Sequence, residues 1–560
     1  MRRVLSIMGV ALGLLLLAIP VFGQVKFPYT GAAVEFSVWM ATGLDNPQDL
    51  ADNPTPTMAE WMKRLGNIKW KVYGNAMADY DTRLAILAQN GPLYDFSVNV
   101  RPAVDIANNY GAAGQMLDLM PYVEAGKMPN LKKNYLDKFP TVLNVCPTGK
   151  NGKKQLFTVG QMQDGAEMPE SFLYNKTILA KFGIAVPTTS DEYLAAMKKL
   201  KAADPNLVPF IYMWNSFADI AQYSGLHFIF SPYRPNNFNW DPSQQKWVHG
   251  TQEQSSHLKE FLMYMNQMYT AGLFNPDQET QKGDAWTKLA QSGNWGFTYT
   301  YYSNARVLPN GSGMIKAGAA NKYEIAGMYV PKGPNGLAAV LWGGRDTGGP
   351  YWGLCVNAKV KNPDLAVAII DYLYSDEALV FQNYGTEGVT FKKNVDGSMS
   401  FLPEWNTAIN PNGYKDLDKY GLGSALIPYA NVARTSSRFA RYYAPEVLDM
   451  ASYALRGLYN GKHTAQVLEF ATPPVTAAEG DQIGKIAGPI NTYVEENLVK
   501  FIKGTRSFDD WGTFVQDVKN LGVQKVLDIW NSKPRSSYVV PAPWTKAEIV
   551  KMLADMGQKP

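Results

Sequence analysis

The stretch Val34-Glu-Phe-Ser-Val-Trp-Met40 alternates apolar and polar side chains, and Ile68-Lys-Trp-Lys-Val-Tyr73 repeats this alternation further along the chain. A period of two residues is typical of a strand with one buried face. The segment 58–65 between them has the composition of a helix, and a third strand pattern follows at Leu93-Tyr-Asp-Phe-Ser-Val98. Repeated alternation of strands and helices predicts a mostly parallel sheet with helices on both faces.

The rest of the chain continues this α/β pattern and ends in helices. Residues 171–192 predict a strand, a short helix stopped by Gly183 and the start of a second helix. Apolar side chains recur at helical spacing over 254–271, and again in the tail from 483 to 530. A chain of 560 residues exceeds what one hydrophobic core usually organises. We therefore expect at least two lobes.

The first residues have the pattern of an export signal. Arg2 and Arg3 precede an uncharged apolar run over 4–22, and a small residue, Gly23, stands where a signal peptidase would cut. Residues 1–23 are therefore expected to be a cleaved signal peptide. The alternative is a membrane anchor, but the run is shorter than the roughly 20 apolar residues that span a bilayer comfortably. Because no cysteine lies near the cut, an acyl anchor has no attachment site, and we expect a soluble periplasmic protein.

The charge balance gives no reason to expect nucleic acid or anionic lipid as a partner. The formal net charge is only +4, and two of the positive charges belong to the export signal. The chain is 46% hydrophobic and 18% charged, which is ordinary for a globular protein.

The cysteines and histidines do not indicate a metal site. Cys146 and Cys355 are far apart in the sequence, which favours two buried free thiols, although export would allow a disulfide. The histidines lack the spacing of metal ligands and stand at positions 227, 249, 257 and 463.

The stretch Asn383-Tyr-Gly-Thr-Glu-Gly-Val-Thr-Phe391 resembles the Tyr-Gly-x-Glu-Gly-x-x-Tyr signature of extracellular solute-binding proteins that serve carbohydrate ABC importers. It is the end of one of four blocks that resemble the long branch of this family, which includes alginate-oligosaccharide binders. The blocks follow the family's order and cover 80–96 with 114–123, 173–188, 362–391, and 492–523.

This resemblance implies a type II-like periplasmic-binding-protein fold with two hinge-connected α/β lobes, a ligand cleft and extra C-terminal helices. The implied first lobe takes 24–155 plus about 350–400, and the second takes about 156–349 plus about 401–560. The implied function is to capture a carbohydrate, here an oligosaccharide, and deliver it unchanged to the permease subunits of an importer. Such a protein is expected to be a monomer with no cofactor and no enzymatic activity.

One departure from the family concerns calcium. Many members of the long branch carry an acidic, glycine-containing calcium loop between an Asp-Pro-Asn segment and a strand that begins with proline. The corresponding stretch here is only Asp204-Pro-Asn-Leu-Val-Pro-Phe210. A calcium loop needs several oxygen ligands on a 12-residue frame. We therefore expect no calcium at this position.

Candidate ligand-binding residues come from turn-rich segments that follow predicted strands. Sugars present apolar ring faces and hydroxyl edges, so a suitable cleft offers aromatic faces and bidentate polar side chains. The densest cluster of glycine, aromatic and charged residues lies over 341–352. Each tryptophan could instead be a core residue. The candidates are Trp39, Asn99, Trp214, Trp295, Tyr301, Trp342, Arg345, Asp346, Trp352, Tyr429 and Arg438.

Two rival functions remain open on the sequence alone. A secreted polysaccharide-degrading enzyme would stack on sugars in the same way, and the 49 acidic residues leave room for a catalytic carboxylate pair. The sequence has no Gly-x-Ser-x-Gly, His-Glu-x-x-His or P-loop motif. Glu387 stands between Gly385 and Gly388, which favours a tight turn over catalysis. The second rival is a peptide-binding component of an importer.

Overall fold

The computed structural model describes most of residues 25–560. The described residues are 25–41, 46–75, 94–100, 110–111, 113–143, 146–149, 151–160, 162–164, 170–213, 216–253, 257–281, 285–301, 323–342, 353–405, 420–422, 426–428, 433–435, 445–468, 473, 475–535 and 543–560.

The N-terminal part forms a sheet in which strands from distant parts of the sequence are neighbours. Its order is β2 (Gly66–Asn75), β1 (Tyr29–Ala41), β3 (Phe96–Val100), β13 (Gly353–Val356) and β4 (Val159–Gly160). Strand β1 runs parallel to β2 and to β3, while β13 is antiparallel to β3 and β4. The strand-helix-strand prediction is confirmed, because helix α2 (Pro56–Leu65) connects β1 to β2 after its N-cap residue Thr55.

One face of this sheet builds the core of the first lobe. Phe36, Val38 and Met40 alternate along β1 and are buried. They belong to a cluster that includes residues of α2 and of two helices that follow β13 in the sequence, α12 (Pro363–Leu373) and α13 (Asp376–Tyr384). Leu426 and Ile427 belong to the same core. The chain therefore returns to the first lobe after position 401, where the sequence placed the second lobe.

The second sheet has the order β11 (Ile325–Met328), β6 (Glu170–Asn175), β10 (Trp295–Tyr301) and β7 (Val208–Ile211). Strands β10 and β7 are parallel, and β6 is antiparallel to β10 and β11. Helix α8 (Ser190–Ala203) begins with a capping box between Thr189 and Glu192. Helix α10 (Leu258–Thr270) confirms the helix expected over 254–271, with Phe261, Met265 and Met268 in the core of this lobe.

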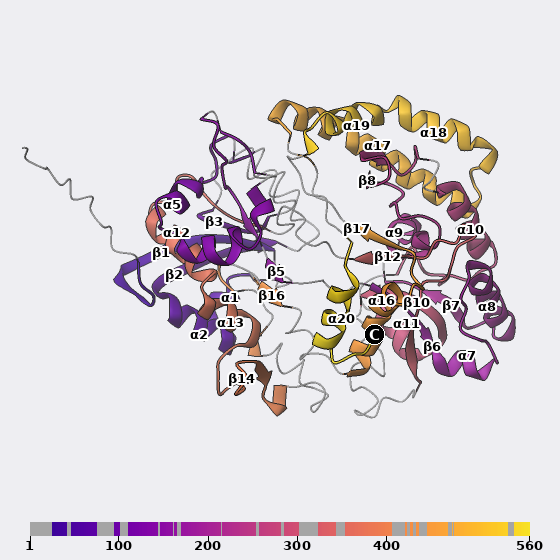
Figure 1. Ribbon diagram of the computed structural model, residues 1–560, viewed down its shortest axis with the longest axis horizontal. Coiled ribbons are helices and arrows are strands. Elements are labelled where there is room, and N and C mark those ends of the chain that lie inside the picture. Colours follow the sequence, from indigo (N-terminus) through magenta and orange to yellow (C-terminus); the bar gives the residue numbers. More distant parts are fainter. Residues whose placement is uncertain are drawn as a thin grey trace, which may run out of the picture.

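The C-terminal helices complete the second lobe. Helix α17 (Ala477–Lys503) is followed by α18 (Trp511–Asn520) and α19 (Val523–Asn531). Buried side chains of α17, among them Ile490 and Phe501, lie in the same core as α10. Figure 1 shows these helices along the outer side of the second lobe, far from β1 and β2. The predicted helical tail is confirmed.

Smaller elements fill in both lobes. The described ones are α1 (Asp49–Asp52), α5 (Met120–Glu124), α6 (Pro129–Leu131), α7 (Lys176–Lys181), α9 (Phe217–Tyr223), α11 (Ala285–Ser292), α16 (Pro445–Tyr459), α20 (Lys546–Asp555), β8 (Phe238–Asp241), β9 (Lys246–His249), β12 (Ala339–Trp342), β14 (Phe391–Lys393), β15 (Met399–Phe401) and β17 (Ala465–Leu468).

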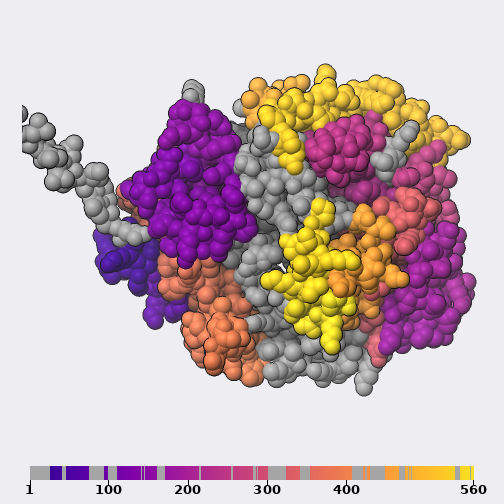
Figure 2. All heavy atoms as spheres, viewed as in Figure 1, coloured from indigo at the N-terminus to yellow at the C-terminus, as the bar shows by residue number. Residues whose placement is uncertain are grey.

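The chain passes between the two lobes along a short ribbon of two strands. Strand β5 (Met162–Asp164) leads from β4 of the first sheet to β6 of the second. Strand β16 (Ala433–Thr435) leads from the segment 426–428 to α16, and it pairs with β5 in parallel. Figure 1 shows β5 and β16 between the two groups of sheets and helices. In the space-filling view, the surfaces of 113–160 and 353–405 make up the left side of the molecule, at the upper and lower left, while the C-terminal helices extend along the top (Figure 2).

Candidate functional site

The carboxyl ends of the parallel strands in the first sheet form one edge. In open α/β sheets, ligands bind outside the carboxyl ends of the strands. The register of β1 places Trp39 opposite Tyr73 of β2 and Ser97 of β3. These residues share the face opposite the core, because Val38 and Met40 point to the other side of β1. Trp39 is only 2% exposed.

An aromatic pair connects β2 to the start of β3: Tyr73 is near the carboxyl end of β2, and Tyr94 stands two residues before β3 begins. The rings of Tyr73 and Tyr94 are stacked, with centroids 4.5 Å apart and an interplanar angle of 30°. The ammonium of Lys71 is 5.6 Å from the centroid of the Tyr73 ring. Burial raises the pKa of the Tyr94 hydroxyl, with a smaller contribution from Tyr73. The candidates from the sequence omitted both tyrosines. The alternation over 68–73 puts Tyr73 on one face of its strand, but only the register shows that this is the face of Trp39.

A serine and an aspartate fix how β1 and β3 meet. The Asp95 carboxylate accepts hydrogen bonds from the backbone N–H of Ser37 at 2.8 Å and from its hydroxyl at 2.7 Å. The Ser37 hydroxyl oxygen in turn accepts a bond from the backbone N–H of Asp95 at 3.0 Å. Asp95 is the aspartate that the resemblance carries over, and in this structure it braces the two strands.

The carboxyl end of β3 is irregular at Asn99. Strand β13 pairs Leu354 with Val98 and Gly353 with Val100, so the register skips Asn99. Such bulges redirect side chains and are frequent beside functional sites. The backbone of Asn99 therefore lies at the expected edge, while its side chain is outside what the structure describes.

The second sheet offers a corresponding edge where β7 and β10 end and β6 begins. There the register pairs Tyr301 with Glu170 and Thr300 with Ser171. The exit of β7 is held by Gln281, whose side-chain amide donates to the Tyr212 carbonyl at 2.9 Å. This bond fixes the backbone two residues before Trp214, which is a candidate from the sequence.

Trp295 lies at the other end of β10 and is fully buried, with an exposed fraction of 0%. Its indole N–H donates to the Ala290 carbonyl at 2.9 Å, and its ring meets Tyr323 edge to face. Trp295 therefore contributes to the core of the second lobe in this structure, and we do not include it in the proposed site.

The remaining candidates are described only in part or lie outside the described residues. Tyr301 and Trp342 are the last residues of β10 and β12, and only their backbones are described. The other candidates lie outside the described residues: Trp214, Arg345, Asp346, Trp352, Tyr429 and Arg438.

Glu387 lies in the tight turn that the sequence predicts. The neighbouring glycines have positive φ angles, +80° at Gly385 and +78° at Gly388, where a side chain would be strained. The Glu387 carboxylate is 3.6 Å from the ammonium of Lys393, and its side chain is 53% exposed. This exposed ion pair is consistent with a structural role.

The segment that corresponds to the calcium loop of relatives does not fit a calcium ion. The Asp204 carboxylate accepts the backbone N–H of Asn206 at 2.9 Å, so it closes the turn after α8. The ammonium of Lys201 donates to the Pro205 carbonyl at 2.8 Å. A cationic side chain at the carbonyls of this turn opposes binding of a second cation there.

The thiols and the described histidines are not grouped as the ligands of a metal ion would be. Cys146 and Cys355 are both free, as the sequence favoured, but only Cys355 is fully buried, while Cys146 is partly buried. Desolvation raises the pKa of each thiol to about 12. Burial lowers the pKa of His249 to about 3 and that of His463 to about 4. Within the described part of the chain, no three His, Cys, Asp or Glu side chains are grouped to hold a metal ion.

A small cavity lies within the second lobe and not between the lobes. Its walls come from β6, β10, β11, β12 and α16, and they include Phe172, Tyr299, Val340 and His463. Because this lining is mostly apolar, the cavity suits a polar ligand such as a sugar poorly. The strand edges described above are the better candidate site. Separately, the helices of the described residues include none that is long and apolar enough to cross a membrane.

Comparison with known proteins supplies a family match. Residues 49–380, more than half of the chain, match the family model described as bacterial extracellular solute-binding protein. The chain is 22% identical over 458 residues to the fructooligosaccharide ABC transporter substrate-binding protein FusA of Streptococcus pneumoniae, which covers 76% of this chain and 78% of that protein.

Solved structures share the fold. The alginate-binding protein AlgQ2, solved without calcium ion, superposes with a TM-score of 0.69 at 18% identity, covering 91% of this chain and 99% of that one. FusA in complex with kestose gives a TM-score of 0.67 at 18% identity, covering 89% of this chain and 98% of that one. At this identity the likeness establishes the arrangement of the elements and not the ligand.

Proposed function

Because this chain belongs to the bacterial extracellular solute-binding protein family, we propose that it captures an oligosaccharide between its two lobes and delivers it to the permease of an ABC importer. The observation that carries the proposal is the stacked, half-buried pair of Tyr73 and Tyr94, in which Tyr73 lies opposite Trp39 in the strand register. The sugar ligands of the relatives support the same class of ligand, since FusA is a fructooligosaccharide binder and AlgQ2 an alginate binder.

The proposed chemistry is stacking on one side of the sugar and hydrogen bonding around its edges. Tyr73 and Tyr94 are half-buried, so their rings keep surface that an apolar sugar face could cover. Hydroxyl groups would be bound by the amide of Asn99 and by the charged pair Arg345 and Asp346. The proposed site further includes the remaining candidates from the sequence, Trp214, Tyr301, Trp342, Trp352, Tyr429 and Arg438.

Capture proceeds by closure of the lobes, with the β5 and β16 ribbon as the hinge. Two short paired strands resist bending less than the larger sheets on either side, and hinges of this kind absorb domain closure. Closure excludes water from the sugar and strengthens its polar contacts. In the proposed cycle no covalent bond of the sugar changes, so the protein needs no cofactor. We further propose that it acts in the periplasm as a monomer after loss of residues 1–23.

A ligand panel tests this function. Kestose and alginate oligosaccharides, together with a panel of short peptides, are titrated into the purified protein by calorimetry, and melting temperature is followed in parallel. Saturable binding of a sugar with a rise in melting temperature is expected, because a ligand of the folded form stabilises it. Saturable peptide binding without sugar binding would replace the proposal with a peptide importer component. Release of shorter sugars during incubation would replace it with an enzyme.

A further inference from the structure

Two passages of the chain between the lobes meet at one pair of glycines. Gly160 is the last residue of β4, where the first passage leaves the N-terminal sheet. Gly353 is the first residue of β13, where the chain re-enters that sheet after β12. The antiparallel register pairs these two residues directly. Because β4 and β13 are paired here, a movement of either strand at these glycines displaces the other strand.

Two tyrosine hydroxyls hold the peptide groups on either side of Gly160. The backbone N–H of Gly160 donates to Tyr135 Oη at 3.2 Å, and Tyr374 Oη donates to the Gly160 carbonyl at 2.6 Å. The first bond orients the peptide plane before the Cα atom, and the second orients the plane after it. Because each peptide unit is planar, these bonds together restrain both φ and ψ of a residue that is otherwise permissive.

The two tyrosines are themselves fixed in the first lobe. Tyr135 is 2% exposed and Tyr374 is fully buried, and their ring centroids are 5.3 Å apart. The Asn134 side-chain amide donates to the backbone carbonyl of Tyr374 at 2.9 Å, which connects the two segments that carry the rings. The hydroxyls are thus presented by the rigid core of the lobe.

We propose that Tyr135 and Tyr374 are positioning residues for lobe closure, which hold Gly160 so that the chain bends only beyond it, in the β5 and β16 ribbon. This inference rests on the closure described under the proposed function. It assigns to the two hydroxyls a role beyond stability, namely to set where the hinge begins and how far the lobes move when no ligand is bound.

The test measures the distance between the lobes without any sugar. Spin labels are attached at Lys63→Cys on α2 and Lys198→Cys on α8, two exposed positions on opposite lobes. In the labelled parent the partly buried Cys146 is replaced by serine, while Cys355 is buried. Distance distributions are compared between the labelled parent and the variants Tyr374→Phe and Tyr135→Phe. The matched control is Tyr264→Phe, which removes a buried hydroxyl that donates to the Ser190 carbonyl at 3.0 Å within the second lobe.

The proposal expects a wider or shifted distance distribution in Tyr374→Phe and Tyr135→Phe and a parental distribution in Tyr264→Phe. Each of the three variants loses one hydrogen bond, so the melting temperature of each should fall by a similar amount, about 2–4 °C. Parental distributions in both hinge variants, despite that loss, would show that the hydroxyls only stabilise the lobe and would overturn the proposal. Since no sugar is present, a failure of sugar binding would leave this result standing.

Discussion

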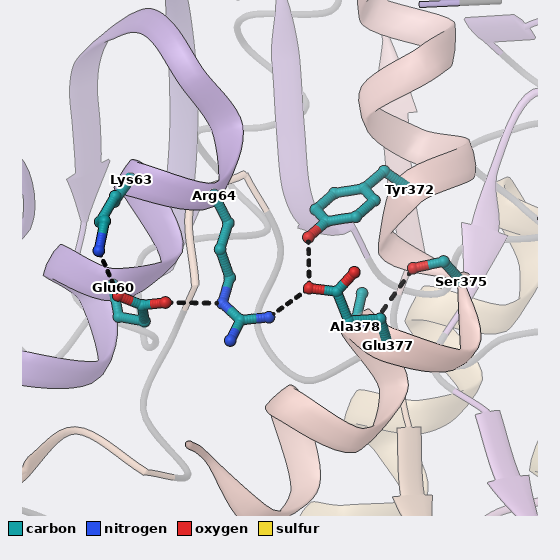
Figure 3. Close-up of polar contacts among 7 residues, drawn as sticks. All are labelled: Glu60, Lys63, Arg64, Tyr372, Ser375, Glu377 and Ala378. Carbon is teal, nitrogen blue, oxygen red and sulfur yellow. Dashed lines mark hydrogen bonds and ion pairs between the residues drawn. The ribbon is translucent and has the colours of Figure 1, made fainter. Parts of the chain in front are cut away.

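Arg64 of α2 is joined to Glu377 of α13 by a hydrogen-bonded ion pair, although the two residues are far apart in the sequence (Figure 3). The Arg64 guanidinium also contacts Glu60 on its own helix at 3.1 Å and lies 4.4 Å from the centroid of the Phe381 ring. Arg64 therefore connects the helix between β1 and β2 to the helix that precedes the Tyr-Gly-x-Glu-Gly signature.

We expect Arg64→Met to lower the free energy of unfolding by about 1–2 kcal/mol, because it removes partly exposed ion pairs and a cation–π contact. The control is Lys63→Met on the same helix, whose ammonium is 3.7 Å from Glu60 while its side chain is 82% exposed. That change should cost less than about 0.5 kcal/mol. Urea unfolding measures both variants, and equal losses would show that the link between the helices contributes nothing.

The stacked pair of Tyr73 and Tyr94 gives a prediction for ligand binding. Tyr73→Ala should weaken sugar binding about tenfold, equal to about 1.4 kcal/mol, because it removes a stacking face. Tyr122→Ala is a matched control: Tyr122 is half-buried in the same lobe, and the ammonium of Lys127 lies 5.6 Å from its ring, as Lys71 does from Tyr73. Calorimetry with the sugar that the panel identifies compares the two, and equal affinities would remove Tyr73 from the site.

Buried histidines predict a loss of stability in acid. His463 accepts the backbone N–H of Val330 through Nε2 at 3.0 Å, and its Nδ1 lies 3.1 Å from the Ala454 carbonyl, so the neutral ring fits with Nδ1 donating. Its folded pKa of about 4 is below the value of about 6.5 expected in the unfolded chain. The unfolded state therefore binds more protons between these values, and stability that is complete above about pH 6.5 decreases as pH falls toward 4.

The size of this effect is about 1–2 kcal/mol for His463 between pH 7 and pH 5. Chemical unfolding at both pH values measures it in the parent and in His463→Gln. The variant should be less stable at pH 7, because two backbone groups lose their partner. Its stability should nevertheless depend less on pH than that of the parent. An unchanged pH dependence would show that other groups cause the loss.

The thiols should be unreactive in the folded protein. Burial raises the pKa of both Cys146 and Cys355 to about 12, so almost no thiolate forms at pH 8. We expect no reaction with a disulfide reagent such as DTNB under native conditions and two reacting thiols per chain in guanidinium. If no thiol reacted in guanidinium without reductant, the disulfide that export allows would be present instead.

The turn after α8 predicts stability that does not depend on calcium. Adding EDTA or Ca²⁺ should leave the melting temperature unchanged, because Lys201 and Asp204 already satisfy the polar groups of this turn. Lys201→Met should lower the melting temperature more than Lys198→Met, an exposed position on the same helix. A rise in melting temperature with Ca²⁺ would contradict this account of the turn.

Local patterns in the sequence determined much of the fold. The alternation over 34–40 and 68–73 predicted β1 and β2, and helical spacing predicted α10 and α17, because each pattern depends only on which side chains share a face. The ordered blocks predicted the family, which the match over 49–380 confirms, and the two-lobe fold, which the solved relatives confirm. The site was predicted only as a strand edge.

Tertiary structure alone decided which distant segments meet. The insertion of β13 between β3 and β4, the pairing of β5 with β16, and the hold of Tyr135 and Tyr374 on Gly160 join residues that no local period connects. The same holds for Trp295, which the sequence could not distinguish from a ligand-binding tryptophan until its indole N–H was seen bonded to Ala290. The physical reason is that the local sequence pattern determines which face of a helix or strand a side chain lies on. The residue that it contacts across the structure is determined by the packing of the whole chain.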